Sequence, residues 1–449
     1  MHSEKAAADY SVTLDGGNIA RWATPADTTA IEDVYGTVFA DPSTGGYNDQ
    51  IVTYLRGLLG GSQPYGSIHD VAIVIDPAGV VVSAVLLMRM PLDAAGTRIT
   101  AGRPDLVVSR DDVRNRGYIR TLFSLIHARS AAYGDVLQAI SGIPYYYRRF
   151  GYEYALSLGG SHIYPTDAIP ALAAGTEEPY SIRPAGSADI DALIACYRHD
   201  CVLPRGDEPL LFTADIDRSY WEFVLSPAAA ADTWYPYMIV DRSGATVGSI
   251  GVGRFRYSEQ LEFYYCNTCV SVDMQVLAPS VLRQLSAIAD QVASAAPGTP
   301  PFGALRANLG VAHPLHTALA QVLQRREEPY AWSIRVPSPA ALLTALAPVL
   351  SARLQAHAVT HFARPLVISL YRGGVSLDYR DGKVSAIDLE RCDAPQASYP
   401  AGQFVQHVLG FRSTAALTAM HMDVRIDPAA RPLFDVLFPA QPSWVTPID

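Results

Sequence analysis

The sequence predicts an α/β fold, with two tandem units of mixed sheet and helix followed by a smaller α+β domain. Three observations predict it. The 449 residues exceed one ordinary core, the order of strand-like and helix-like segments recurs after a linker, and the last third changes character. Apolar residues make up 49% and charged residues 17% of the chain, which is typical of a globular protein. We therefore expect domains at residues 1–172, 173–336 and 337–449.

The first unit is expected to run helix, three strands, helix, strand, short turn and strand. Apolar and β-branched runs between turn residues predict the strands, and longer amphipathic runs predict the helices. The segments in order are 23–40 (helix), 70–76, 79–90 and 97–109 (strands), 115–133 (helix), 135–141 (strand), 142–150 (turn or short helix) and 152–160 (strand).

The second unit repeats this order after a linker at residues 169–186. Its expected segments are 187–200 (helix), 234–255 (hairpin), 261–273 (strand), 279–293 (helix), 302–308 (strand), 313–326 (helix) and 330–336 (strand). Where the first unit has VRNRGYIR, the second has DMQVLAPSVLR, without the arginines around a glycine. We therefore expect the second unit to be a degenerate copy.

The third domain is expected to pack apolar helices on one small antiparallel sheet. The predicted segments are 338–355 (helix), 365–371, 374–380 and 383–389 (strands), and 400–410, 413–420 and 430–438 (helices). This pattern predicts a small α+β domain without a catalytic cluster.

Composition also limits the functional classes. The net charge of -10 argues against a nucleic-acid partner, because phosphate backbones attract basic proteins. The longest apolar run, at residues 80–88, is far shorter than the roughly 18 residues needed to cross a bilayer, and the first residues lack a signal-peptide core. Five cysteines without a regular framework suit a reducing compartment. We expect a cytoplasmic protein with no membrane partner.

The stretch VRNRGYIR concentrates Arg114, Arg116, Gly117 and Arg120 at the start of a helix, directly after a strand. The first amides of a helix have no partner within it, and the helix dipole makes that end positive. A glycine lets an anion approach the backbone closely, and arginines add bidentate hydrogen bonds. The pattern predicts a pyrophosphate-binding turn, although it matches neither the P-loop nor the dinucleotide fingerprint. The alternative is a solvated helix start with surface arginines.

In this order of elements, the R-x-x-G turn at residues 114–117 resembles the acyl-CoA cradle of the GNAT N-acetyltransferases. The segment YYRRFGYEYAL resembles the tyrosine-bearing segment of the enhanced-intracellular-survival (Eis-like) acetyltransferases. Those proteins consist of two tandem GNAT units, the second degenerate, and a sterol-carrier-like C-terminal domain. The resemblance implies this plan for the three domains expected above. The family commonly has Gly or Ala at the position of Ile119, so the branched side chain there is a departure.

The resemblance also implies where acetyl-CoA, the expected co-substrate, would bind. Backbone groups of Leu106, Val107 and Val108 would hydrogen-bond the pantetheine arm. Gly142 and Ile143 would flank the thioester. The pyrophosphate would be held by Arg114, Asn115, Arg116, Gly117, Tyr118 and Ile119, assisted by Arg120.

Two catalytic residues follow from the same resemblance. Aligned on RFGY, Tyr147 falls where the family has its general acid, with Tyr146 and then Tyr145 as alternatives in register. A phenol suits this role, because its ordinary pKa near 10 keeps it protonated at neutral pH. The family's C-terminal carboxylate acts as general base, so Asp449 could supply its α-carboxylate or its side chain. Glu153 could direct the amine or relay its proton through water.

Other clusters favour structural roles. Cys266 and Cys269 fall in a predicted strand without a second pair, which indicates buried thiols rather than a metal site. His313 and His316 share a helix face, but one such pair makes a poor metal site. The consecutive residues 199–201 (His, Asp, Cys) point in different directions and cannot form a triad. We expect no metal.

Together these features predict an acetyl-CoA-dependent N-acetyltransferase that transfers acetyl directly to a cationic amine, either an aminoglycoside-like polyamine or a lysine side chain. The acidic composition is compatible with a cationic acceptor. One alternative is a protein that binds an apolar ligand in the C-terminal domain and uses the GNAT units as scaffold. The other is an N-acyltransferase with a longer acyl donor. Because the related family forms symmetric homo-oligomers, we expect one here.

Overall fold

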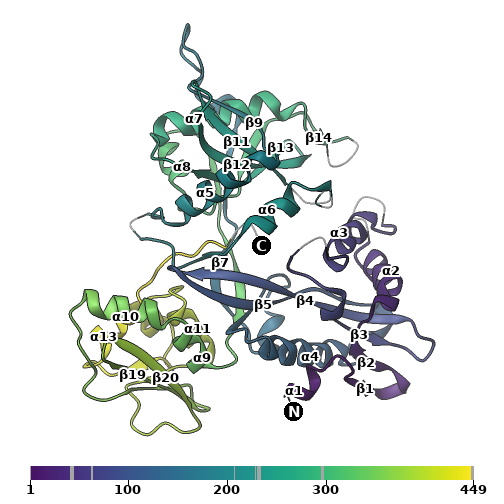
Figure 1. The fold of residues 1–449 in the computed structure, drawn as a ribbon, viewed down its shortest axis with the longest axis vertical. Helices are drawn as coiled ribbons and strands as arrows, with labels where there is room; N and C mark the ends of the chain where they lie inside the picture. The colour runs from purple at the N-terminus through teal and green to yellow at the C-terminus, as the bar shows by residue number, and fades with distance from the viewer. Residues whose placement is uncertain are drawn as a thin grey trace.

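A computed structural model describes residues 2–40, 45–61, 64–206, 208–227, 229, 234–294 and 298–445. Figure 1 shows three bodies: the N-terminal unit at the lower right, the second unit at the top and the C-terminal domain at the lower left. The first two are built on mixed sheets with helices, and the third carries its helices on a small separate sheet. This confirms the predicted α/β class, with two tandem units and an additional α+β domain.

The strands of the first sheet pair almost entirely antiparallel, with one parallel pair. Its strands in spatial order are β1 (Ser11–Thr13), β2 (Ile19–Trp22), β3 (Val71–Ile75), β4 (Val81–Ala94), β5 (Thr97–Ser109), β6 (Leu137–Ile140), β17 (Tyr330–Arg335) and β7 (Glu153–Leu158), and β10 (Phe212–Ala214) pairs with β4. Its helices are α1 (His2–Lys5), α2 (Thr28–Val38), α3 (Asp49–Leu59) and α4 (Tyr118–Ala132). Helix α4 covers one face of the sheet, and α2 and α3 cover the other (Figure 1). Helices α1 and α3 and the short β1–β2 hairpin were not predicted.

The second sheet is built on the same scale. Its strands in order are β16 (Arg325–Glu327), β8 (Ser161–Pro165), β15 (Ala304–Ala307), β13 (Gln260–Thr268), β12 (Thr246–Tyr257), β11 (Trp234–Asp241) and β9 (Tyr180–Pro184), and β14 (Ala293–Ser294) pairs with β12. Its helices are α5 (Ile190–Cys201), α6 (Arg218–Val224), α7 (Met274–Ala289) and α8 (Pro314–Ala318). The expected helix over 313–326 is wrong in its second half, because the edge of β8 offers backbone hydrogen bonds that β16 takes up instead.

The third domain has a five-stranded sheet covered by helices. Its strands in spatial order are β20 (Lys383–Leu389), β19 (Gly374–Arg380), β18 (Leu366–Ser369), β21 (Ala397–Ser398) and β22 (Arg425–Ile426). Its helices are α9 (Pro339–Ala345), α10 (Ala347–Ala356), α11 (Ala401–Val408), α12 (Thr414–Met420) and α13 (Arg431–Leu437). The single helix expected over 338–355 is two helices, because Pro348 has no amide to donate and is tolerated only in the first turn of α10.

The two units exchange strands: the first sheet includes β17 and the short β10 from the second unit, and the second sheet includes β8 from the first unit. Strand β17, which follows the second unit in the chain, lies between β6 and β7 of the first sheet and is antiparallel to both. Strand β8, which follows the first unit, lies between β16 and β15 of the second sheet. Trp332 and Ile334 of β17 are fully buried in the core of the first sheet. The boundaries expected at residues 172 and 336 thus separate segments of the chain, but the sheets contain strands from both sides of them. The division into three sequence domains stays a prediction.

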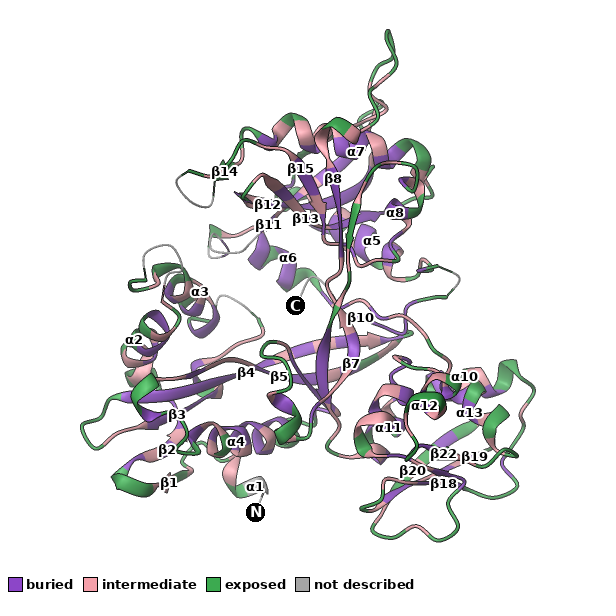
Figure 2. Cartoon of the chain, turned by 180° about the vertical axis from the view of Figure 1, so that it is seen from behind, coloured by how far each residue is buried: buried purple, intermediate pink, exposed green. Residues whose placement is uncertain are grey.

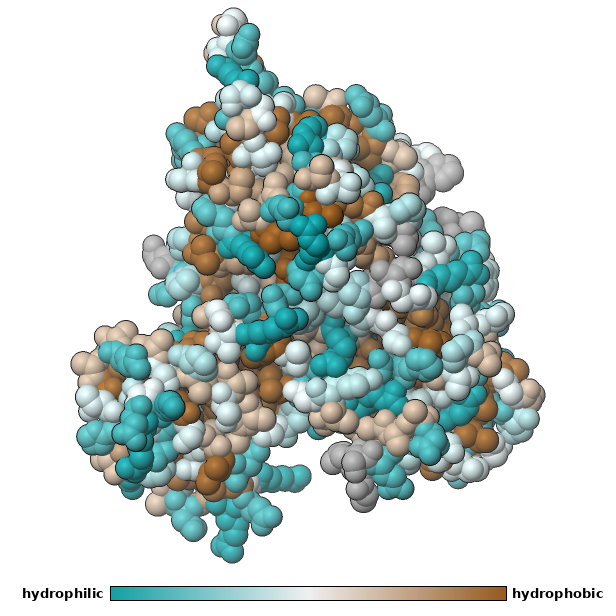
Figure 3. Space-filling view, in the orientation of Figure 1, coloured by the Kyte–Doolittle hydropathy of each residue, from teal (hydrophilic) through white to brown (hydrophobic). Residues whose placement is uncertain are grey.

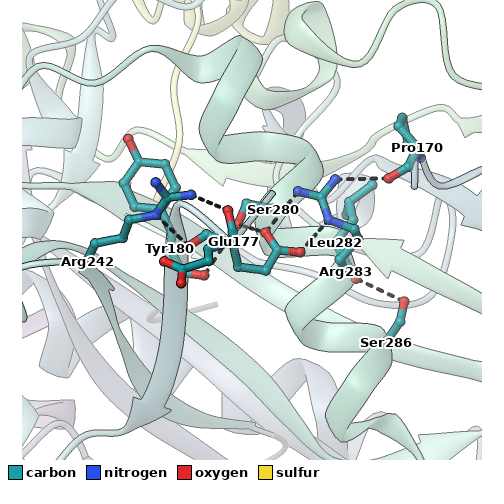
Figure 4. Close-up of polar contacts among 9 residues, drawn as sticks. Pro170, Glu177, Tyr180, Arg242, Ser280, Leu282, Arg283 and Ser286 are labelled. Atoms are coloured by element: carbon teal, nitrogen blue, oxygen red, sulfur yellow. Dashed lines mark hydrogen bonds and ion pairs between the residues drawn. The ribbon is translucent and has the colours of Figure 1, made fainter. Parts of the chain in front are cut away.

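The linker expected over 169–186 is wrong in its second half, because residues 180–184 form strand β9 and pair with β11. Its first half is fixed to the second unit by polar contacts (Figure 4). The Glu178 carboxylate accepts hydrogen bonds from Arg283 of α7, at 2.5 and 2.9 Å, and from Ser280 at 2.8 Å. Arg283 also donates to the Pro170 carbonyl, and Arg242 donates to backbone carbonyls of the linker. The hydrogen bond from Arg283 lowers the pKa of Glu178.

Figure 2 shows the central strand β4 buried along most of its length, whereas the outer faces of the helices are exposed. Hydrophilic residues mix with apolar ones over the face shown in Figure 3. No helix within the described ranges is long and apolar enough to span a bilayer.

Candidate active site

Helix α4 begins with a glycine in the left-handed region. Gly117 is its N-cap, with φ 83° and ψ 4°, and Asn115 also has a positive φ of 66°. A glycine has no side chain to cap the helix, so the first amides of α4 receive no side-chain hydrogen bond at the N-cap. A Cβ added at Gly117 would meet no heavy atom within 4 Å, which means that this backbone faces open space. The turn therefore has the free donors and the access that an anion requires.

Four arginines surround this helix start: Arg114, Arg116, Arg120 and Arg149. Arg114 pairs with Asp111 at 2.6 Å, but both side chains are exposed, so the pair restrains the arginine only weakly. Arg116 donates to the Asp112 carbonyl at 3.5 Å, a long hydrogen bond that an anion could replace. The guanidinium of Arg149 lies 5.0 Å from the centre of the Tyr146 ring. The site is thus strongly positive on a protein that is acidic overall.

A cavity of about 630 Å³ connects this turn with the tyrosine segment. It is lined by Val38, Phe39, Val107, Val108, Ser109, Val113, Arg114, Asn115, Arg116, Gly117, Tyr118, Ile119, Arg120, Ile143, Tyr146, Tyr147, Arg149 and Phe150. Most of the cofactor-binding residues expected from the sequence are therefore brought together around one cavity. Leu106 and Gly142 are not part of its lining.

The strands beside the cavity diverge. Strands β5 and β6 pair only at Ala101–Leu137 and Gly102–Gln138, and the remainder of β5 pairs with β4 on its other side. A bulge in the β4–β5 ladder leaves residues 106–107 without a partner in register. Strands β5 and β6 thus leave a gap in the sheet, and Val107 and Val108 line the cavity at the edge of this gap.

Leu106 sits at the bulge itself, with φ 49°. Its amide donates to the Asp105 carboxylate at 2.8 Å, and its carbonyl accepts a hydrogen bond from the Tyr35 hydroxyl. Both backbone groups of Leu106 are therefore engaged within the protein. The carbonyl of Val108 is also engaged, by the Ser83 hydroxyl at 2.8 Å. The pantetheine-binding role of residues 106–108 stays a prediction.

The three consecutive tyrosines differ in position. Tyr147, in the 3-10 turn Tyr147–Phe150, is only 6% exposed and lines the cavity. Tyr146 is half-buried and also lines it, whereas Tyr145 is 72% exposed and does not. Gly142, with φ 126°, backs onto Tyr147: a Cβ added there would lie 3.6 Å from the Tyr147 hydroxyl. Of the three phenols, Tyr147 is the one held both inside the core and at the cavity.

The Tyr147 hydroxyl is available as a donor, because it has no hydrogen-bond partner among the residues that the structure describes. Burial raises the pKa of Tyr147 above its ordinary value, and the negative charge of Asp105 raises it further. The phenol therefore stays protonated at neutral pH. Asp449 lies outside the described residues.

Several of the lining residues could not be predicted from the sequence. Val38 and Phe39, at the end of α2, lie far from the motif in sequence and reach the cavity only through packing of α2 on the sheet. Arg149 was part of the tyrosine segment, but only its place in the cavity lining makes it a fourth arginine of the site. The doubled arginine in YYRRF was the available signal.

Comparison with known proteins assigns the class. Residues 20–155 match the model of the acetyltransferase (GNAT) domain. This range contains β3 to β6, α4 and the tyrosine segment, which together frame the cavity. The protein is therefore an acyltransferase with a GNAT domain, a class that uses an acyl-CoA and an amine acceptor. No curated protein matches the chain.

Solved structures share the fold over 73 to 95% of the chain. A GCN5-related N-acetyltransferase from Anabaena variabilis is 14% identical, with a TM-score of 0.68, covering 95% of this chain and 99% of that one. Eis1 from Mycobacterium abscessus is 14% identical, with a TM-score of 0.57, covering 94% and 98%. Saccharomyces cerevisiae N-myristoyltransferase with bound myristoyl-CoA is 9% identical, with a TM-score of 0.51, covering 73% and 84%. At these identities the likeness concerns the fold alone.

Proposed function

We propose that the protein is an acetyl-CoA-dependent N-acetyltransferase that transfers acetyl directly to a cationic amine. The observation that carries this proposal is one cavity that is lined both by the arginines of the α4 helix start and by the buried Tyr147. An anionic group and a reacting atom of one extended co-substrate can be held there at the same time. Direct transfer needs this arrangement, because orientation of the amine against the activated acyl group supplies most of the acceleration.

The residues present fit an acyl-CoA. The uncapped amides of α4 and the guanidinium groups of Arg114, Arg116 and Arg120 would hold the diphosphate, and the open face of Gly117 lets it approach the backbone. Val107 and Val108 would line the pantetheine arm along the gap between β5 and β6. When bound, the co-substrate supplies an activated acyl group as a thioester.

Tyr147 is proposed as the general acid. Its protonated hydroxyl, without a competing partner among the described residues, would donate to the leaving sulfur. Asp449 is proposed as the group that takes the proton of the amine, on the resemblance to the Eis-like family alone. Glu153 is less suited to this role, because its carboxylate is paired with Arg148 at 2.5 Å.

A short acyl group is proposed because the core behind Tyr147 is filled. The ring of Phe123 stacks on Phe150 with centroids 4.5 Å apart, and it lies 5.9 Å from Tyr147. Tyr152 closes the cluster at 6.3 Å from Tyr147. A longer acyl donor is the alternative, and its support is the fold shared with an enzyme whose structure contains bound myristoyl-CoA.

The C-terminal domain is proposed to be sterol-carrier-like in fold, and the whole chain Eis-like. The alternative function, an apolar-ligand carrier, is less well supported, because buried aromatic side chains fill the interior between helices and sheet. The rings of Tyr399, Phe404, His407, Phe434 and Phe438 pack with centroids 5.3 to 6.3 Å apart. We further propose a cytoplasmic homo-oligomer that binds no nucleic acid.

Calorimetric titration with CoA, acetyl-CoA and myristoyl-CoA, followed by assay of free-thiol release with polyamines and lysine peptides, tests this function. We expect CoA and acetyl-CoA to bind with similar affinity, since both carry the diphosphate, and thiol release to require an amine. Absence of CoA binding would reject the transferase. A stronger response to myristoyl-CoA would replace acetyl by a long acyl group.

A further inference from the structure

The first residue of the exchanged strand β17 reaches the tyrosine turn, which we define as residues 142–147. The Tyr330 hydroxyl donates to the carbonyl of Gly142 at 3.2 Å. It also lies 2.9 Å from the hydroxyl of Tyr154 on β7, and the two rings pack edge to face with centroids 5.5 Å apart. The amide of Tyr145 donates to the Tyr154 hydroxyl at 3.0 Å. Residues of three separate chain segments thus meet at this turn.

These contacts have one consistent set of donor directions. Because Tyr330 gives its only hydroxyl hydrogen to the Gly142 carbonyl, it must accept the hydrogen of Tyr154. Tyr154, having given its hydrogen away, accepts from the amide of Tyr145. These hydrogen bonds therefore close a loop across the turn, which runs from the Tyr145 amide through the hydroxyls of Tyr154 and Tyr330 to the Gly142 carbonyl. Each hydroxyl donates once and accepts once.

The loop ties together the two backbone positions that bend the turn. Gly142 has φ 126° and Tyr145 has φ 65°, a value that a non-glycine residue adopts rarely and only where its surroundings hold it. The backbone of Gly142 touches Tyr147, since a Cβ added at Gly142 would lie 3.6 Å from the Tyr147 hydroxyl. A displacement of this turn would therefore displace Tyr147, which lines the cavity.

Tyr145 and Tyr154 are also held by other contacts. The guanidinium of Arg148 lies 4.4 Å from the ring centre of Tyr145 and 5.5 Å from that of Tyr154. Gln406 of α11 donates to the Tyr154 carbonyl at 2.9 Å, which adds a contact from the C-terminal domain. Burial, with the hydrogen bond to Tyr154, raises the pKa of Tyr330 to about 12, so its hydroxyl keeps its hydrogen in neutral solution.

We propose that Tyr330 is a positioning residue of the acyltransferase, supplied by the second unit to hold the tyrosine turn and, through it, the Tyr147 hydroxyl. The proposal rests on the function proposed above for Tyr147. It assigns the second unit a part in the reaction although that unit lacks the arginine-glycine turn. The local sequence YAWSIRV carries no sign of this, because the hydroxyl reaches the first unit only through strand exchange.

The test is Tyr330→Phe, which keeps the ring and removes one hydroxyl. We expect kcat for thiol release to fall by roughly 10- to 100-fold, the effect of a misplaced catalytic group, while KM for acetyl-CoA stays within about twofold. Tyr154→Phe breaks the same loop, so the double variant should lose no more than either single one. Melting temperatures should stay close to that of the parent protein.

Tyr235→Phe is the matched control, because the Tyr235 hydroxyl also donates to a backbone carbonyl, that of Ala185 at 2.9 Å, in the second unit away from the cavity. It should leave kcat unchanged. Hydrogen exchange at the amides of residues 145–147 gives a readout that needs no turnover, and Tyr330→Phe should accelerate it there.

Unchanged exchange and unchanged kcat in Tyr330→Phe would overturn the positioning role. If the parent protein binds CoA but releases no thiol, the proposed transfer fails, and the exchange measurement alone decides whether Tyr330 holds the turn.

Discussion

Replacing Tyr147 by phenylalanine tests the proposed chemistry most directly. The substitution removes a single oxygen from a side chain that is 6% exposed and keeps the ring in contact with Phe123 and Tyr152. Because the hydroxyl has no partner among the described residues, its loss breaks no hydrogen bond there. We therefore expect a melting temperature near that of the parent protein and an unchanged affinity for acetyl-CoA.

The expected loss lies in turnover. General acid catalysis contributes roughly 100- to 10,000-fold, which corresponds to about 2.7 to 5.4 kcal/mol of transition-state stabilisation. Because burial raises the pKa of Tyr147, the acid form persists through neutral and mildly alkaline pH. The parent enzyme should thus show no decline in kcat from this group below about pH 10.

Single-turnover thiol release, with calorimetry for binding, separates the two effects. Tyr265→Phe serves as control, since it removes a hydroxyl from a tyrosine of the second sheet that is only 4% exposed, and it should leave turnover intact. Full turnover in Tyr147→Phe would refute the assignment and move the acid to Tyr146 or to water. A large loss of acetyl-CoA affinity would contradict the separation between binding and chemistry.

Four further outcomes are expected. Arg116→Ala should weaken CoA binding by about 10-fold in calorimetry, and less at high salt, because it removes a charge-assisted contact to the diphosphate. Gly117→Val should weaken CoA binding and lower the melting temperature, since φ 83° costs a side chain about 1 to 2 kcal/mol although the space is open. Burial lowers the pKa of His316 to about 3 and that of His407 to about 4. Near pH 6.5 these two histidines therefore take up protons in the unfolded chain but not in the folded chain. Thermal scans should show that their contribution to stability is constant above about pH 6.5 and falls as the pH drops from there towards those values. Trp332→Ala should cost about 3 to 5 kcal/mol in denaturant titration, because Trp332 is fully buried in the first sheet.

The parts of the site that are local in sequence could be predicted from it. The arginine-glycine turn lies at the start of one helix. Residues 114–119 all line one cavity, because consecutive residues of a turn stay together. Much of the order of elements in the first unit was also predictable, because strand and helix periods depend on neighbouring residues, but α1, the β1–β2 hairpin and α3 were missed.

Non-local features could not be predicted in this way. Tyr330 and Trp332 lie in a segment that was expected as a strand, but its periodicity does not indicate which sheet it joins. The engagement of the Leu106 carbonyl by Tyr35 depends on how α2 packs, and the helix expected after His313 ends early because β8 arrives from the first unit. Each of these depends on pairing between distant segments, about which a local pattern is silent.

Strand exchange also has a consequence for synthesis of the protein. Domains usually fold one after another as the chain leaves the ribosome. Here β6 and β7 lack this partner until residues 330–335 have been made, so the edges of both strands remain unpaired while the whole second unit is synthesised. Such edges are templates for aggregation, and a fragment ending at residue 172 would keep them permanently. The two units must therefore mature together.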